Sequence, residues 1–120
     1  MFYTGVTNNG IVVINRGDTF SMLLNINMGE PSAPIIYFLS PLDIVYFSIC
    51  EPNQEFEAGV VRKKYTSVNQ LEDGSVEIIL NSSDTEHLMP GTYYYEIKLK
   101  IGGEEEIVNT IVPKRKLVMC

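Results

Sequence analysis

The side chains that could carry out acid–base or nucleophilic chemistry in this sequence are few and far apart. His87 is the only histidine, and it lies in a polar stretch just before Pro90-Gly91. An acid–base scheme near neutral pH would most naturally use this imidazole, but the sequence offers it no plausible partner. Cys50 ends an apolar run, where a thiol is expected to be buried and unreactive. We therefore expect no enzyme and no cofactor.

The acidic residues do not form a recognisable metal site. Glu104, Glu105 and Glu106 follow a Gly-Gly pair, but neighbouring residues of a strand point to opposite faces and cannot share one ion. Asp18 and Asp84 fit turn or capping positions better than ligand positions. The chain contains no His-Glu-x-x-His motif, calcium-binding loop or Cys/His cluster. We predict no bound metal.

Two short segments match known functional motifs, but neither match requires a function in this protein. Arg16-Gly17-Asp18 matches an integrin-binding tripeptide, but Gly-Asp between two predicted strands is ordinary turn chemistry. Asn81-Ser82-Ser83 matches a glycosylation acceptor, yet no secretory signal supports that use. Both are interpreted as chance matches.

The strongest structural signal is the alternation that follows Pro90-Gly91. One face of this stretch carries aromatic and aliphatic residues and the other carries polar ones, which is the pattern of a half-buried strand. The entry sequence from Leu88 to Tyr93 resembles the corner that leads into a late strand of immunoglobulin-like sandwiches. Tyr93 is therefore predicted to be buried, with its hydroxyl bonded to backbone near residues 84–88.

Most other segments also show the pattern of strands. Strands are predicted over residues 11–15, 19–28, 43–50, 60–66, 74–80, 91–101 and 104–112, with a short last one over 116–119. Turn residues separate them, and only residues 83–88 could form a short helical turn. The sequence predicts an all-β, immunoglobulin-like antiparallel β-sandwich of about seven strands.

Alternation also predicts which residues form the core. The inward set consists of Phe20, Met22, Leu24, Ile26, Val45, Phe47, Ile49, Val76, Ile78, Leu80, Tyr93, Tyr95, Ile97 and Leu99. Residues 11–120 are expected to form this single domain, and residues 1–10 a flexible N-terminal arm.

Composition narrows the possible partners. The chain has 120 residues, 45% of them hydrophobic, and a net charge of -6. This charge disfavours nucleic-acid binding, because binding requires Lys and Arg to displace counterions from phosphates. No apolar stretch reaches the roughly 18 residues of a membrane span. We expect neither nucleic acid nor membrane as a partner, and a protein made in the cytoplasm.

Several segments in order resemble a family of phage virion domains, the N-terminal domain of baseplate upper proteins and related tail or head accessory proteins. The resembling segments are residues 16–20, 41–43, 64–66, 73–80, 84–99 and 110–117, and the resemblance extends over about residues 14–118. It implies an immunoglobulin-like domain of a tail, baseplate or capsid-decorating protein, with no catalytic residues.

These observations lead to two hypotheses about function. The first is a non-enzymatic phage structural protein located in the virion, bound to other virion proteins in many copies or as a homo-oligomer. The alternative is a carbohydrate- or receptor-binding sandwich. Candidate partner-binding residues are the apolar residues of the N-terminal arm and two tyrosines: Phe2, Tyr3, Val6, Tyr37 and Tyr94.

Overall fold

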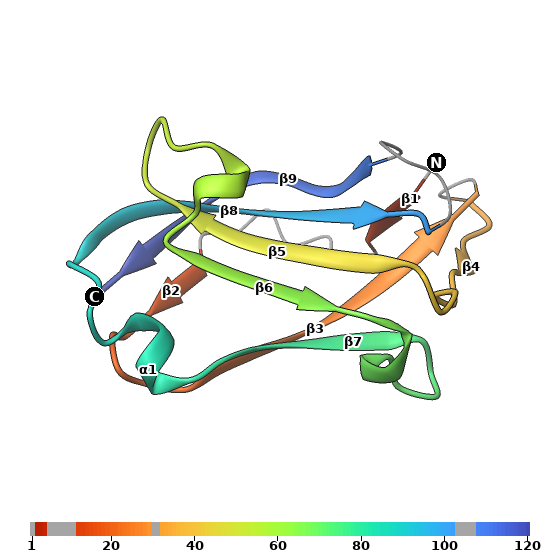
Figure 1. Ribbon diagram of the computed structural model, residues 1–120, viewed down its shortest axis with the longest axis horizontal. Helices are drawn as coiled ribbons and strands as arrows, with labels where there is room; N and C mark the ends of the chain where they lie inside the picture. Colours follow the sequence, from red (N-terminus) through yellow and green to blue (C-terminus); the bar gives the residue numbers. More distant parts are fainter. Residues whose placement is uncertain (1, 5–11, 30–31, 103–107) are drawn as a thin grey trace.

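The chain folds into two β-sheets packed face to face (Figure 1). The computed structural model describes residues 2–4, 12–29, 32–102 and 108–120. This architecture confirms the predicted all-β sandwich. Within the described residues, no helix is long and apolar enough to cross a membrane.

The larger sheet has five strands in the order β2-β9-β8-β5-β6. Its bounds are β2 (Val12–Ile14), β5 (Ile44–Cys50), β6 (Val61–Tyr65), β8 (Gly91–Lys100) and β9 (Val108–Met119). The pairs are antiparallel except that β2 runs parallel to β9. The long strands β8 and β5 lie in the middle, so their backbones are paired along both edges.

The second sheet is built around β3 (Phe20–Met28). Strand β7 (Ser75–Leu80) pairs with residues 20–25 of β3, while β1 (Phe2–Thr4) and β4 (Ile35–Ile36) pair with its last residues. The two-residue β4 lies in the connection between β3 and β5, where no strand was predicted. This sheet therefore has short strands at the β4 end of the sandwich (Figure 1).

In the part of the chain that the structure describes, helical structure is limited to single turns in the connections. These are η1 (Phe56–Ala58), η2 (Ser67–Asn69) and α1 (Ser82–Thr85). At the start of α1 the backbone N–H of Asn81 donates to Asp84 Oδ2 at 2.7 Å. The predicted helical turn at residues 83–88 is thus present but begins and ends earlier.

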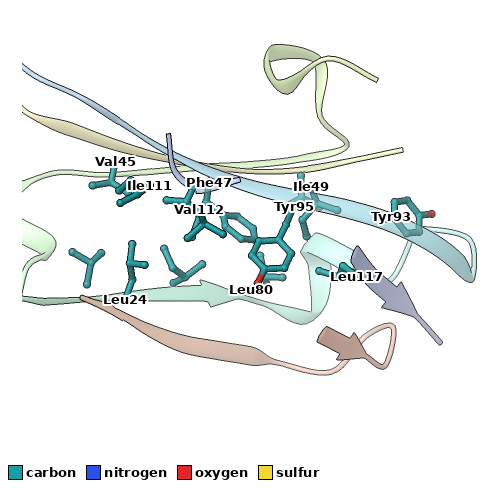
Figure 2. Packing of buried hydrophobic residues seen from close by; sticks show 14 of the residues in the cluster. Leu24, Val45, Phe47, Ile49, Leu80, Tyr93, Tyr95, Ile111, Val112 and Leu117 are labelled. Carbon is teal, nitrogen blue, oxygen red and sulfur yellow. The ribbon is translucent and has the colours of Figure 1, made fainter. Parts of the chain in front are cut away.

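The core lies between the two sheets, where side chains from both layers interdigitate (Figure 2). Twelve of the 14 predicted core residues are buried, whereas Phe20 and Met22 are partly buried and pack against the cluster. Alternation missed residues outside the clearest strands. The additional buried hydrophobic residues are Ile14, Leu39, Val61, Leu88, Ile111, Val112, Leu117 and Met119, while Cys50 is buried as predicted.

Strand β9 corrects one prediction. A separate strand over residues 116–119 was expected after Pro113, but β9 runs without a break to Met119. Its register with β8 shifts twice, between Tyr95 and Ile97 and between Ile97 and Lys98. Proline cannot donate to a ladder and is tolerated at such irregularities. The bulge accommodates Pro113 and lets the strand continue.

Tyr93 occupies the predicted corner. Its side chain is buried, and its hydroxyl donates to the carbonyl oxygen of Met89 at 2.7 Å. The acceptor lies one residue beyond the predicted range of 84–88. The bond ties the start of β8 to the turn before it, as in the tyrosine corner of sandwich domains.

The variant Tyr93→Phe is expected to lower the free energy of unfolding by about 0.5–1.5 kcal/mol, because one hydrogen bond is lost and the carbonyl of Met89 loses its donor. Urea unfolding followed by circular dichroism measures the change. Tyr94→Phe, on the outer face of the same strand, is the matched control. Equal stability of Tyr93→Phe and the wild type would contradict a structural role for this hydroxyl.

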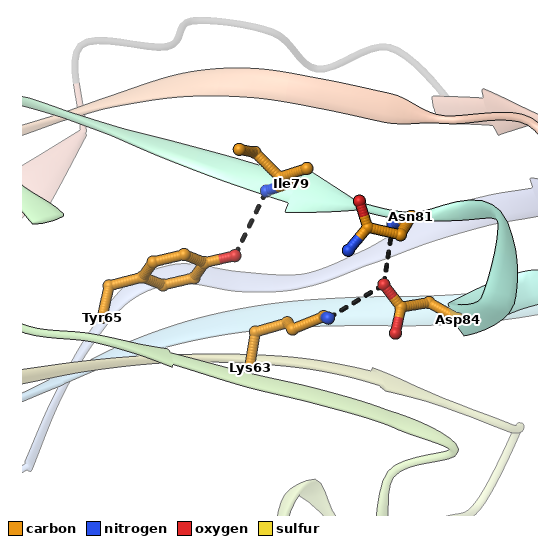
Figure 3. A network of polar contacts seen from close by, with 5 residues as sticks. All are labelled: Lys63, Tyr65, Ile79, Asn81 and Asp84. Carbon is orange, nitrogen blue, oxygen red and sulfur yellow. Dashed lines mark hydrogen bonds and ion pairs between the residues drawn. The ribbon is translucent and has the colours of Figure 1, made fainter.

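Side chains close the side of the sandwich between β6 and β7 (Figure 3). Lys63 Nζ of β6 lies 2.8 Å from Asp84 Oδ2, and the backbone N–H of Ile79 in β7 donates to the Tyr65 hydroxyl at 3.2 Å. Lys63 thus links β6 to α1, the helical turn that follows β7. The lysine–aspartate pair also lowers the pKa of Asp84, against the opposing effect of its partial burial.

The predicted N-terminal arm is described only in part. Phe2–Thr4 form β1, whose backbone pairs with residues 26–28 of β3. The rest of the arm, including Val6, lies outside the described residues, so its flexibility stays a prediction.

Candidate functional site

Two surfaces of the sandwich combine exposed side chains in a way that could bind a partner. The first, called here the β4 patch, consists of Ile36, Phe38 and Leu71. They are 45%, 57% and 50% exposed. Contiguous exposed apolar side chains on a folded domain often mark protein-binding sites. Ile35, on the opposite face of β4, is also exposed.

The polar framework under the β4 patch fixes its shape. Gln70 donates through Nε2 to the carbonyl oxygens of Tyr37 and Gly74, and its Oε1 accepts from the N–H of Leu39 at 2.8 Å. Gly74 has φ +90, and a Cβ placed there would lie 2.4 Å from Ile36 Cγ2. Glycine is needed both for this φ and for the close approach of Ile36. The loop from β4 is thereby held against the start of β7.

A buried carboxylate anchors the other end of the same loop. Asp43 is 1% exposed and accepts three hydrogen bonds. Gly102 N–H donates to Oδ1 at 2.7 Å and Ser40 N–H to Oδ2 at 2.9 Å, while the Tyr37 hydroxyl also donates to Oδ2. This network joins the loop before β5 to the end of β8.

The network changes the acidity of both side chains. Burial tends to raise the pKa of Asp43, but the hydrogen bonds from Gly102, Tyr37 and Ser40 together hold it below its ordinary value. The pKa of the Tyr37 phenol is raised, first by burial and then by its bond to Asp43 and the charge there. The carboxylate is thus ionised at neutral pH, and its partners suit a structural anchor.

The second surface is the outer face of the five-stranded sheet. Tyr46 of β5 stands directly opposite Lys98 of β8 on one side and Lys64 of β6 on the other. Ser48, two residues along, stands between Glu96 and Arg62. Residues opposite each other in a sheet share a face. These pairings bring basic and aromatic side chains from three strands together.

The connection from β5 to β6 folds over part of this outer face. The Ser48 hydroxyl donates to the carbonyl oxygen of Phe56 at 2.8 Å, which fixes η1 above the strand. The Phe56 ring then lies under Lys98, whose Nζ is 4.6 Å from the ring centroid. Gly59 permits this fold because a Cβ there would lie 2.1 Å from Ser48 Oγ. The turn is therefore a fixed part of the surface.

The candidate partner-binding residues do not form one site. Tyr37 is half-buried and its hydroxyl is bonded to Asp43. Tyr94 lies on the outer face of the large sheet, opposite Cys50 and Lys116. Phe2 and Tyr3 lie in β1, paired through their backbones, and Val6 lies outside the described residues. The structure does not bring Tyr37 and Tyr94 together.

The residues considered for chemistry are dispersed as well. His87 is exposed, whereas Cys50 is buried with its thiol 3.4 Å from the carbonyl oxygen of Glu55. Among the residues that the structure describes, no group of three or more His, Cys, Asp or Glu could hold a metal ion. The triplet Glu104 to Glu106 lies outside that part of the chain.

The Arg16-Gly17-Asp18 tripeptide lies in a turn that is held against α1. Arg16 donates to the carbonyl oxygen of Leu88, and the Gly17 N–H donates to Thr85 Oγ1.

Sequence reasoning missed both surfaces as units. Ile36 lies in β4 and Phe38 just after it, in a segment where no strand was predicted. Tyr46 lies in a predicted strand, but its basic neighbours follow from strand register, which alternation alone does not give. Phe56 carried no signal.

The fold and these surfaces define an all-β sandwich domain with two candidate binding faces. A comparison with protein-family models found no match. A search of curated proteins likewise found no significant match.

Proposed function

We propose that this protein is a non-enzymatic structural component of a phage particle that binds neighbouring virion proteins. The β4 patch is the surface that carries this binding. In a tail, baseplate or capsid, many copies would present the same patch to equivalent neighbours.

The single observation that supports a binding role best is the exposure of the β4 patch. Phe38 is 57% exposed although hydrogen bonds on both sides fix its loop. Burying such a rigid aromatic residue against a partner stabilises a complex and costs little ordering entropy. The short β4 adds an edge next to which a neighbour's strand could pair.

The assignment to a phage particle has separate support. It rests on the ordered segments between residues 16 and 117 that resemble baseplate upper proteins and related accessory proteins. The all-β sandwich is the fold that this resemblance implies. The binding role and the phage context can therefore be tested separately.

Particle incorporation tests the proposal. Particles that lack the protein are complemented with wild type or with Phe38→Ser, purified, and analysed by mass spectrometry. We expect Phe38→Ser to fold normally but to be incorporated at least about tenfold less, as expected when a central anchoring contact is lost.

Val68→Ser is the matched control, because Val68 is 89% exposed and lies in η2 outside the β4 patch. It should be incorporated like wild type. Equal incorporation of Phe38→Ser would show that the patch is not the binding surface. Absence of the wild-type protein from purified particles would refute the virion role itself.

A further inference from the structure

The basic residues of this acidic protein are concentrated on the outer face of the five-stranded sheet. The chain has 9 Lys and Arg against 15 Asp and Glu. Strand register and alternation place five of the basic side chains on this face: Arg62, Lys64, Lys98, Lys100 and Lys116. The same face carries Glu96 on β8 and Glu57 in η1, but the basic residues outnumber them, so the face is locally positive on a molecule whose net charge is negative, which favours an anionic ligand there.

Two shallow hollows on this face share residues. They have volumes of about 340 and 440 Å³, and Tyr46 and Arg62 line both. Lys63 and Lys64 complete the first hollow. Phe56, Glu57, Lys98 and Val108 complete the second. Together they form a furrow centred on Tyr46, with Arg62 and Lys64 of β6 on one side and Lys98 of β8 on the other.

The chemistry of the furrow has two components. Tyr46 and Phe56 offer ring surface that can cover the C–H face of a sugar and remove it from water. Arg62 and Lys64 are exposed, so their charges are open to a ligand, and guanidinium groups bind carboxylates with two parallel hydrogen bonds. Lys98 is oriented by its contact with the Phe56 ring. We infer that this furrow binds a carboxylated saccharide chain, with a sugar ring over Tyr46 and carboxylates near Arg62 and the lysines.

Other anionic polymers fit the furrow less well. The furrow crosses β6, β5 and β8, and β5 and β8 are paired on both edges. An extended peptide lying over β5 and β8 would find no free backbone edge for strand addition, because the only free edge in the furrow belongs to β6, the last strand of the sheet order. A nucleic acid would bring a denser row of charges toward a protein of net charge -6, which opposes binding. A saccharide chain with one carboxylate per sugar needs no backbone edge and carries fewer charges, so the aromatic and basic side chains of the furrow are sufficient to bind it.

Nuclear magnetic resonance titration of the ¹⁵N-labelled protein with trigalacturonate tests this inference. We expect saturable shifts of amide signals in β5, β6 and β8, and none with neutral maltotriose at the same concentration. Arg62→Gln and Tyr46→Ala should each weaken binding about tenfold or more, the usual effect of losing a charged hydrogen bond or a central aromatic contact.

Lys116→Gln is the matched control, because it removes the same charge from the same face but lies opposite Tyr94, outside the furrow residues. It should leave the affinity within about twofold of wild type, as expected for an exposed charge away from the ligand. If Arg62→Gln and Lys116→Gln lowered the affinity for trigalacturonate equally, the binding would be explained by general charge attraction, and the inference would be overturned.

Three further outcomes would also overturn it. These are the absence of saturable shifts with trigalacturonate, equal binding of maltotriose, and tighter binding of oligo-dT or hexaglutamate than of the sugar. The test uses the isolated protein and does not depend on particle incorporation. Failure here therefore leaves the proposed structural role intact, and failure of that role leaves this site intact.

Discussion

Replacing Leu99 with alanine is expected to lower the free energy of unfolding by about 2–5 kcal/mol, the range for a buried leucine whose removal leaves a cavity. Leu99 is 0% exposed and is the last but one residue of β8. It stands opposite Val45 on one side and Asn109 on the other. Surrounding strands that are paired on both edges cannot collapse into the space, which favours the upper part of the range. Urea unfolding followed by circular dichroism measures the change.

Leu42→Ala is the matched control, since the same atoms are removed from a side chain that is 68% exposed. It should change the free energy of unfolding by less than about 0.5 kcal/mol. A loss for Leu99→Ala no larger than that of the control would contradict the placement of the core between the two sheets.

Replacing Asp43 with asparagine is expected to cost about 1.5–3 kcal/mol, the worth of a hydrogen bond to a charged group. An asparagine side chain cannot accept both backbone hydrogen bonds that the Asp43 carboxylate accepts. Each carboxylate oxygen accepts from a backbone N–H, Oδ1 from Gly102 and Oδ2 from Ser40. Whichever way the amide turns, its NH₂ faces one of these donors.

Acid should remove the same contribution from the wild type. The folded pKa of Asp43 is lowered, so its stabilising effect is complete above the unfolded pKa of about 3.9 and disappears as the pH falls through the folded value. The stability difference between wild type and Asp43→Asn should therefore be largest near neutral pH and shrink below about pH 4. Asp18→Asn, at an exposed position, is the control and should show little difference. A difference that is independent of pH would argue against the ionised anchor.

Strand positions and most of the core could be predicted because period-two alternation is a local property of the chain. Ile97 and Leu99 are identified by their neighbours alone. Phe20 and Met22 have the same pattern but are only partly buried, although they pack against the core cluster. Ile111 and Leu117 were missed because the bulges around Pro113 shift the alternation of β9. Burial there depends on register, which the local pattern does not encode.

The candidate surfaces could be predicted less well for a related reason. Tyr46, Arg62 and Lys98 come from three strands and meet only after the sheet has formed. The candidates Tyr37 and Tyr94 were chosen as single aromatic residues. In the structure the Tyr37 hydroxyl donates to Asp43, and Tyr94 lies on β8 between Cys50 and Lys116. Which side chains become neighbours on the face of a sheet depends on the order and register of its strands, and a local sequence pattern does not give these.

The parallel pairing of β2 with β9 has a consequence for how the protein folds during synthesis. Val12 pairs with Leu117, and the N–H of Cys120 donates to the carbonyl oxygen of Ile14. A ribosome makes the chain from its N-terminus, so β2 emerges long before its only described partner strand exists. Contacts this distant in sequence close large loops and form slowly. We expect the sandwich to close only after β9 has emerged from the ribosome, and protease sensitivity of β2 in ribosome-bound chains whose β9 is still inside the exit tunnel would reveal this delay.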